Sequence, residues 1–158
     1  MKKQSSSMQL TRAADYGVRV MIHLAGLTAN GRISLPDLAQ ATGAPESFLS
    51  KVLQSLARAG FITSRRGQSG GFRITPRGAE ATMREVIEAI DGPICLNICI
   101  IPGRSCTRKP RCPAHPVWIE AQKAMLEVLS GATVASLASP AAPTLARIAR
   151  AGSKSVWA

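Results

Sequence analysis

All four cysteines of this 158-residue chain lie within one short segment, residues 95–115. They are Cys95, Cys99, Cys106 and Cys112, and glycine, proline and basic residues separate them. This composition predicts a loop. Thiolates gathered on one loop suit a zinc ion or an iron–sulfur cluster. The segment is therefore the first place in the chain where chemistry is expected.

Several basic side chains lie between or beside these cysteines: Arg104, Arg108, Lys109 and Arg111. Nearby positive charge favours thiolates over thiols and would offset the negative charge of a cluster. Two other interpretations stay open. A structural zinc is one, although the paired C-x2-C spacing typical of zinc sites is missing. A cluster-free thiol switch, for example between Cys95 and Cys99, is the other.

The composition narrows the class of protein. Lys and Arg number 20 against 9 acidic residues, for a formal net charge of +11, which indicates a polyanionic partner such as DNA. The lysines at the start of the sequence are followed by a polar run, whereas a secretory signal would have an apolar core there. No apolar run is long enough to span a bilayer. We therefore expect a cytoplasmic protein without membrane contact. The sequence contains no catalytic triad, C-x-x-C pair or phosphate loop, so we do not expect an enzyme.

The first half of the chain predicts a helix-turn-helix. Apolar residues recur at helical spacing over residues 10–28, with Val18, Met21, Ile22 and Ala25 on the expected inner face. A short capped helix should follow from Ser34 and stop at Gly43. A third helix is predicted over residues 45–59, where an apolar stripe faces the core. Its polar face carries the candidate DNA-contacting residues Ser47, Ser50, Lys51 and Gln54.

A β-hairpin is predicted directly after these helices. Residues 61–65 and 72–75 have strand character, and the glycine-rich segment 66–71 between them predicts a turn. The tip is basic, so Arg65 and Arg66, with Gly70 and Gly71, are candidates for contacting phosphates or the minor groove. The expected fold is mainly α with a small β-hairpin wing: a winged helix-turn-helix DNA-binding domain over residues 9–81.

The rest of the chain predicts a second region, residues 82–138. Residues 76–81 are expected to connect the two regions. A capping-box pattern at Thr82 starts a helix that ends near Asp91. The cysteine loop follows, and then a long C-terminal dimerisation helix over residues 116–130. Its expected apolar seam is Trp118, Ala121, Met125 and Val128. Residues 1–8 are expected to be flexible, and residues 139–158 a disordered tail.

Several short motifs together resemble the Rrf-type family of winged-helix iron–sulfur transcription regulators, over residues 8 to about 138. They are MQLT at 8–11, DYGVR at 15–19, AGFI at 59–62, SRRG at 64–67, GGF at 70–72 and HPVW at 115–118. The resemblance implies a homodimer that binds a double-stranded DNA operator. It also implies a 2Fe–2S or 4Fe–4S cluster held by Cys99, Cys106 and Cys112. The fourth ligand would be His115 or, as in another branch of the family, the partner subunit's Asp15.

The resulting expectation is a DNA-binding regulator, most simply a repressor. Its DNA affinity would depend on an iron–sulfur cluster that senses nitric oxide, redox state or iron status. The alternative is a cluster-free winged-helix regulator with a cysteine thiol or zinc switch. Asp15 has a simpler interpretation too, as the ion-pair partner of Arg12 or Arg19.

Overall fold

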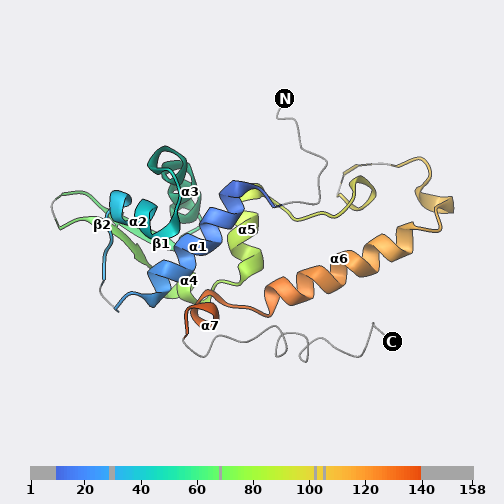
Figure 1. The fold of residues 1–158 in the computed structure, drawn as a ribbon. Coiled ribbons are helices and arrows are strands. Elements are labelled where there is room, and N and C mark those ends of the chain that lie inside the picture. Colours follow the sequence, from blue (N-terminus) through green and yellow to red (C-terminus); the bar gives the residue numbers. More distant parts are fainter. Residues whose placement is uncertain (1–9, 29–30, 68, 102, 105, 140–158) are drawn as a thin grey trace.

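The computed structural model describes residues 10–28, 31–67, 69–101, 103–104 and 106–139. Most of its helices pack around α1 with a two-stranded hairpin at one edge, and one long helix, α6, extends away from them (Figure 1). The expectations for residues 1–8 and for the tail from 140 onward lie outside the described residues. The helices and strands are α1 (Arg12–Gly26), α2 (Leu35–Thr42), α3 (Glu46–Arg58), β1 (Ile62–Arg65), β2 (Gly71–Ile74), α4 (Pro76–Glu80), α5 (Met83–Asp91), the 3-10 turns η1 (Ile98–Ile100) and η2 (Lys109–Arg111), α6 (His115–Ser130) and α7 (Val134–Ala138).

Helix α1 is the centre of the hydrophobic core. Its buried residues are Ala14, Gly17, Val20, Met21 and Leu24. The predicted inner face was only partly right, since Met21 is fully buried but Val18, Ile22 and Ala25 are half-buried. The predicted buried face was misplaced because two small residues near the start of the helix, Ala14 and Gly17, face the core. There they allow close packing, and a Cβ at Gly17 would overlap the Ile90 side chain of α5.

The helix-turn-helix prediction is confirmed. Ser34 caps α2 by accepting a hydrogen bond from the Asp37 amide at 3.3 Å, and α2 ends at Gly43 in a left-handed conformation with φ of 67°. That backbone conformation favours glycine. In α3 the predicted stripe is fully buried, and it comprises Leu49, Val52, Leu53 and Leu56. Burial of this stripe leaves the opposite, polar face of α3 exposed.

The wing is an antiparallel pair in which Ile62 lies opposite Ile74 and Arg65 opposite Gly71. A third segment extends it, because Ile33 and Phe72 exchange two backbone hydrogen bonds of 3.1 and 2.9 Å. Gly71 has φ of 124°, and a Cβ there would lie 2.5 Å from the Ile33 carbonyl oxygen. Only glycine fits this crossing. The hairpin is thereby tied to the segment that leads into α2.

The connector predicted at residues 76–81 contains a short helix that the sequence pattern did not reveal, α4, over residues 76–80. Thr75 starts it by accepting a hydrogen bond from the Gly78 amide at 2.9 Å, and a proline follows in the first turn. Gly78 is buried against the backbone of Phe61, where a Cβ would overlap the carbonyl oxygen. A single turn of helix is enough because tertiary packing and not length stabilises it.

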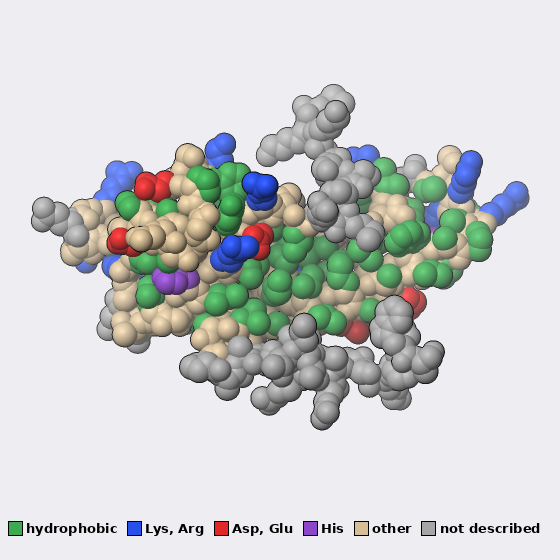
Figure 2. Space-filling view, in the orientation of Figure 1, with side chains coloured by type: hydrophobic (Ala, Val, Ile, Leu, Met, Phe, Trp, Pro, Cys, Tyr) green, Lys and Arg blue, Asp and Glu red, His purple; other side chains and the backbone are tan. Residues whose placement is uncertain are grey.

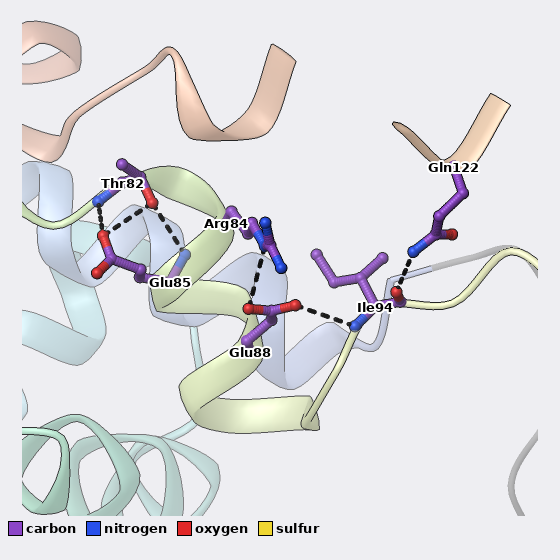
Figure 3. Close-up of polar contacts among 6 residues, drawn as sticks. All are labelled: Thr82, Arg84, Glu85, Glu88, Ile94 and Gln122. Atoms are coloured by element: carbon purple, nitrogen blue, oxygen red, sulfur yellow. Dashed lines mark hydrogen bonds and ion pairs between the residues drawn. The ribbon is translucent and has the colours of Figure 1, made fainter. Parts of the chain in front are cut away.

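Helix α5 begins with the predicted capping box (Figure 3). The Glu85 amide donates to the Thr82 hydroxyl at 3.2 Å, and the Glu85 carboxylate accepts from the Thr82 amide at 2.8 Å. The pKa of Glu85 lies below its ordinary value of 4.5, first because of this amide hydrogen bond and then because of the Thr82 hydroxyl. Burial opposes the shift, and Arg77 and Arg84 add to it.

Helix α6 differs from the others, since none of its 16 residues is buried. Its main neighbours are α5 and η1. No helix in the described part of the chain is both long enough and apolar enough to cross a membrane. Helix α7 returns the chain to the core, where the Val134 amide bonds the Ala81 carbonyl at 2.9 Å.

Replacing Glu85 with alanine should make stability less dependent on pH. Because the folded-state pKa of this carboxyl is depressed, its ionised form stabilises the fold above pH 4.5. That contribution is lost as the pH falls through the depressed folded-state value. Urea titrations should therefore show the difference in free energy of unfolding between wild type and Glu85→Ala shrinking under acid. The control is Glu80→Ala in α4, which removes a carboxylate that belongs to no capping box. A difference that stays constant from neutral to acidic pH would contradict the assignment.

Candidate functional site

The outer face of α3 holds the candidate DNA-contacting residues. Ser47, Lys51 and Gln54 are exposed, so their side chains are free to meet a partner. Ser50 is half-buried, and its hydroxyl donates to the Glu46 carbonyl at 3.1 Å. Such a bond within the helix competes with a contact to a base. The polar face is therefore presented as predicted, with Ser50 the least available of its four members.

The wing presents the other predicted DNA-contacting residues. Arg65 and Arg66 are exposed at the end of β1, where the chain leaves the strand for the turn. Gly70 closes that turn, since its amide bonds the Gly67 carbonyl at 2.9 Å. Gly71 sets the crossing with residue 33, and Arg32 donates to its carbonyl at 3.2 Å. The two arginines thus supply the charged side chains of the wing, whereas the two glycines shape the backbone that carries them.

Asp15 lies on the exposed side of α1, and its carboxylate pairs with Arg19 at 2.9 Å. This is the simpler of the two roles predicted for it. The Arg19 guanidinium lies 5.9 Å from the centre of the Tyr16 ring, and Tyr16 meets Phe48 of α3 edge to face at 5.6 Å. Asp15 is therefore joined through its neighbours to α3.

The four cysteines are free thiols, and each is half-buried. Cys99 lies in η1, while Cys106 and Cys112 flank η2. In the part of the chain that the structure describes, no three His, Cys, Asp or Glu side chains converge closely enough to hold a metal ion. The three predicted cysteine ligands thus share one loop, but the structure does not gather them into a completed site.

His115 is the first residue of α6, and its Nδ1 atom is buried without a hydrogen-bond partner. A buried nitrogen without a partner is costly, and a metal ion is one way to satisfy it. Three thiols and an imidazole form a donor set that iron accepts. The cysteines and His115 therefore supply the donor atoms that an iron–sulfur cluster needs, and the buried His115 nitrogen lacks a partner that iron could provide. In the structure these side chains are not yet gathered around one point.

Two residues that sequence patterns did not reveal hold the start of the loop. Gln122 of α6 bonds the backbone at Ile94 and Leu96, at 2.5 and 2.9 Å. Glu88 of α5 accepts from the Ile94 amide at 3.4 Å (Figure 3). A lone glutamine on a helix carries no recognisable spacing signal. The only hint was a polar residue between apolar neighbours on the side of α6 that faces the molecule.

The entrance to the loop is also tied to α1. Asp91, the last residue of α5, accepts from the Thr11 hydroxyl at 2.7 Å and from the Thr11 amide at 3.3 Å. Thr11 is itself the cap of α1, because it accepts from the Ala14 amide at 3.2 Å. The end of α5 and the start of α1 are therefore fastened together just before the cysteine loop begins.

Comparison with known proteins identifies the type of molecule. Residues 10–140 match the Rrf2 family model, described as iron-dependent transcriptional regulator. The HTH-type transcriptional regulator NsrR of Geobacillus kaustophilus is 33% identical over 131 residues, which cover 82% of this chain and 89% of that protein.

Solved structures agree with this match. CymR, the global cysteine regulator of B. subtilis, superposes with a TM-score of 0.67 at 27% identity, over 82% of this chain and 95% of that one. The IscR of T. potens gives a TM-score of 0.62 at 25% identity, over 80% and 83%. The predicted winged-helix fold is thus confirmed, and the chain belongs to the Rrf2 family of transcriptional regulators.

Proposed function

We propose that this Rrf2-family regulator binds operator DNA as a homodimer and represses transcription, and that an iron–sulfur cluster on its cysteine loop controls its DNA affinity. The observation that carries the proposal is one continuous structure. A winged helix with an exposed polar face is fastened, through α5 and α1, to the loop that holds all four cysteines. Because its partner is DNA, we place it in the cytoplasm and assign it no enzymatic activity.

DNA binding follows from exposure and charge. The first turns of α3 present Ser47 and Lys51, and Gln54 follows one turn later, so these side chains would meet base edges and phosphates in the major groove. Ser50 would add a contact only by giving up its bond to residue 46. Arg65 and Arg66 of the wing, shaped by Gly70 and Gly71, would meet phosphates or the adjacent minor groove. The net charge of +11 supports such a partner.

Cys99, Cys106 and Cys112 are the proposed thiolate ligands of a 2Fe–2S or 4Fe–4S cluster, which when bound would supply a centre sensitive to nitric oxide, oxidants or iron supply. His115 is favoured over Asp15 as the fourth ligand. Its buried Nδ1 has no partner, whereas the Asp15 carboxylate already pairs with Arg19. Mixed ligation leaves one iron easier to remove, which suits a sensor.

A cluster-free thiol switch is the second candidate, and two observations favour it. The described cysteines do not converge on a metal site. The solved relatives include a global cysteine regulator and an oxidised form of Staphylococcus aureus CymR, at 27% identity. In this version the thiols themselves, for example Cys95 with Cys99, would carry the signal. Iron and sulfide content separates the two candidates.

The proposed homodimer would form through the outer face of α6. Val117, Ala121, Ala124 and Val128 are all exposed and recur at i, i+4, i+7 and i+11, so they form one stripe. Val117 is 66% and Val128 47% exposed. Hydrophobic side chains continue along α6 in the space-filling view (Figure 2).

Of the seam expected from the sequence, Ala121 and Val128 lie on this stripe, but Trp118 and Met125 are half-buried. Small central residues allow a second helix to approach closely.

Arg66→Ala should weaken DNA binding mainly through salt-dependent contacts. Each lost phosphate contact reduces the slope of log affinity against log salt by roughly 0.9, and a dimer would lose about twice that. Fluorescence anisotropy with labelled duplex DNA at several salt concentrations measures the slope. Lys123→Ala on α6 removes an equal charge far from the wing and should leave the slope unchanged. Equal effects of the two variants would argue against a role for the wing.

Protein purified without oxygen should be brown and contain iron and acid-labile sulfide. Alanine at Cys99, Cys106 or Cys112 should abolish most of both, because each change removes one thiolate ligand. Cys95→Ala is the matched control and should keep them. His115→Ala should lower retention more than Asp15→Ala does. A colourless wild type that binds DNA and cannot be reconstituted would reject the cluster and leave the thiol switch.

Val128→Glu should shift the protein from dimer to monomer. A carboxylate placed in an apolar helix contact costs roughly 2 kcal/mol or more, which corresponds to a dissociation constant raised at least about thirtyfold. Sedimentation velocity over a concentration series measures the change. Gln40→Glu on the exposed side of α2 adds the same charge and should not affect association. A wild type that sediments as a monomer would remove the dimer from the proposal.

A further inference from the structure

The start of the cysteine loop is held by a single side chain from α6. The Gln122 carboxamide donates to the Ile94 carbonyl at 2.5 Å and accepts from the Leu96 amide at 2.9 Å. It therefore satisfies one backbone group on each side of Cys95, as the peptide groups of a neighbouring strand would. The half-buried position of Gln122 limits the competing water.

Helix α5 holds the same point from the other side. The Ile94 amide donates to the Glu88 carboxylate at 3.4 Å, and Arg84 holds that carboxylate at 3.2 Å (Figure 3). The amide of Ile94 is thus bound to α5 and its carbonyl to α6. This one residue joins the helix that packs on the DNA-binding domain to the helix that follows the loop.

Further along the loop, the backbone hydrogen bonds are local. The amides of Ile100, Ile101 and Arg104 each bond the carbonyl three residues earlier, and so do those of Lys109 and His115. Local turns of this kind fix the shape of a segment but not its position on the rest of the molecule. In the described part of the loop, the position therefore depends on the anchored start, on the contact of η1 with α6 and on the end at α6.

Gln122 and His115 lie on the same face of α6. They are seven residues apart, which is close to two helical turns and about 10.5 Å along the axis. Since Gln122 points to the start of the loop, His115 projects to the same side, and its buried Nδ1 agrees with this placement. One rigid helix thus carries both the anchor for the start of the loop and the imidazole at its end.

We infer that Gln122 is a positioning residue for the cysteine loop. Its carboxamide fixes the backbone around Cys95 against α6, on the face that carries His115, and so sets where the following turn presents Cys99. Asn97 transmits the placement, because its side chain accepts from the Ile98 amide at 2.7 Å and starts that turn. The inference rests on the proposed cluster function, since the ligand that it positions is Cys99.

The test compares wild type with Gln122→Leu and Gln122→Glu in the full chain. Leucine has a similar size but makes neither hydrogen bond, whereas glutamate keeps the acceptor for Leu96 and loses the donor to Ile94. The first measurement is amide hydrogen exchange of Leu96 in metal-free protein. The second is the rate of iron loss from reconstituted protein to a ferrous chelator. The Gly92 amide, which bonds the Glu88 carbonyl at 3.0 Å, serves as an internal control.

We expect Leu96 to exchange about five- to tenfold faster in Gln122→Leu and nearly as in wild type in Gln122→Glu, with Gly92 unchanged. Iron loss should accelerate by a similar factor in Gln122→Leu, while the melting temperature stays close to wild type. Unchanged exchange of Leu96 would overturn the anchor. Faster exchange with unchanged iron loss would overturn the positioning role and leave a structural contact.

Failure of the proposed cofactor has a separate signature. If wild type takes up no iron and sulfide, the cluster is rejected, and the alkylation rate of Cys99 replaces iron loss as the second measurement. A carboxamide that positions this thiol should then make its alkylation at least severalfold different between wild type and Gln122→Leu. Equal alkylation rates would overturn the inference, whatever the cofactor.

Discussion

The packing of α1 against α5 is the contact on which the rest of the structure depends. The inner face of α1 is closed to solvent, and Gly17 allows the Ile90 side chain to approach its backbone. Helices α2, α3, α4 and α7 and the strand β2 also pack on α1, so its position sets theirs. The Thr11–Asp91 pair then fixes the two helices at the end where the cysteine loop begins. Under the proposed function, a change at that end would reach α3 through these contacts.

The cysteine loop is anchored at both ends and locally structured between them. Its start is bound by Gln122 and Glu88, and its end is the first turn of α6. Such a segment can rearrange its interior at low cost, because few long-range bonds must break. Ligation of several thiols would draw that interior together and pull on both anchors. Because one anchor leads to α5 and the other to α6, the cofactor and DNA would be linked ligands.

Much of the fold followed from sequence patterns, and the failures have physical reasons. The stripe of α3 was predicted correctly because four aliphatic residues at helical spacing leave no other inner face. The stripe of α1 was partly misplaced because Ala14 and Gly17 are buried without being strongly apolar, and because the chosen spacing left out the fully buried Val20. Helix α4 was missed because one turn has too few residues to show a period, and Thr75 and Gly78 stabilise it through contacts with the backbone of Gly60 and Phe61, just before β1. Residues such as Gln122 act through backbone groups far away in sequence, which no local pattern encodes.

The choice of fourth ligand shows how the structure adds to a resemblance that leaves two answers. In sequence, Asp15 and His115 match the fourth ligand of different branches of the family. In the structure the Asp15 carboxylate is exposed and paired with Arg19, and ligating a metal would require breaking that pair. His115 would break nothing, because its buried Nδ1 atom has no partner to lose. An exposed ion pair is worth at most about 1 kcal/mol, whereas an unsatisfied buried nitrogen costs roughly 1–3 kcal/mol. Both terms favour the histidine.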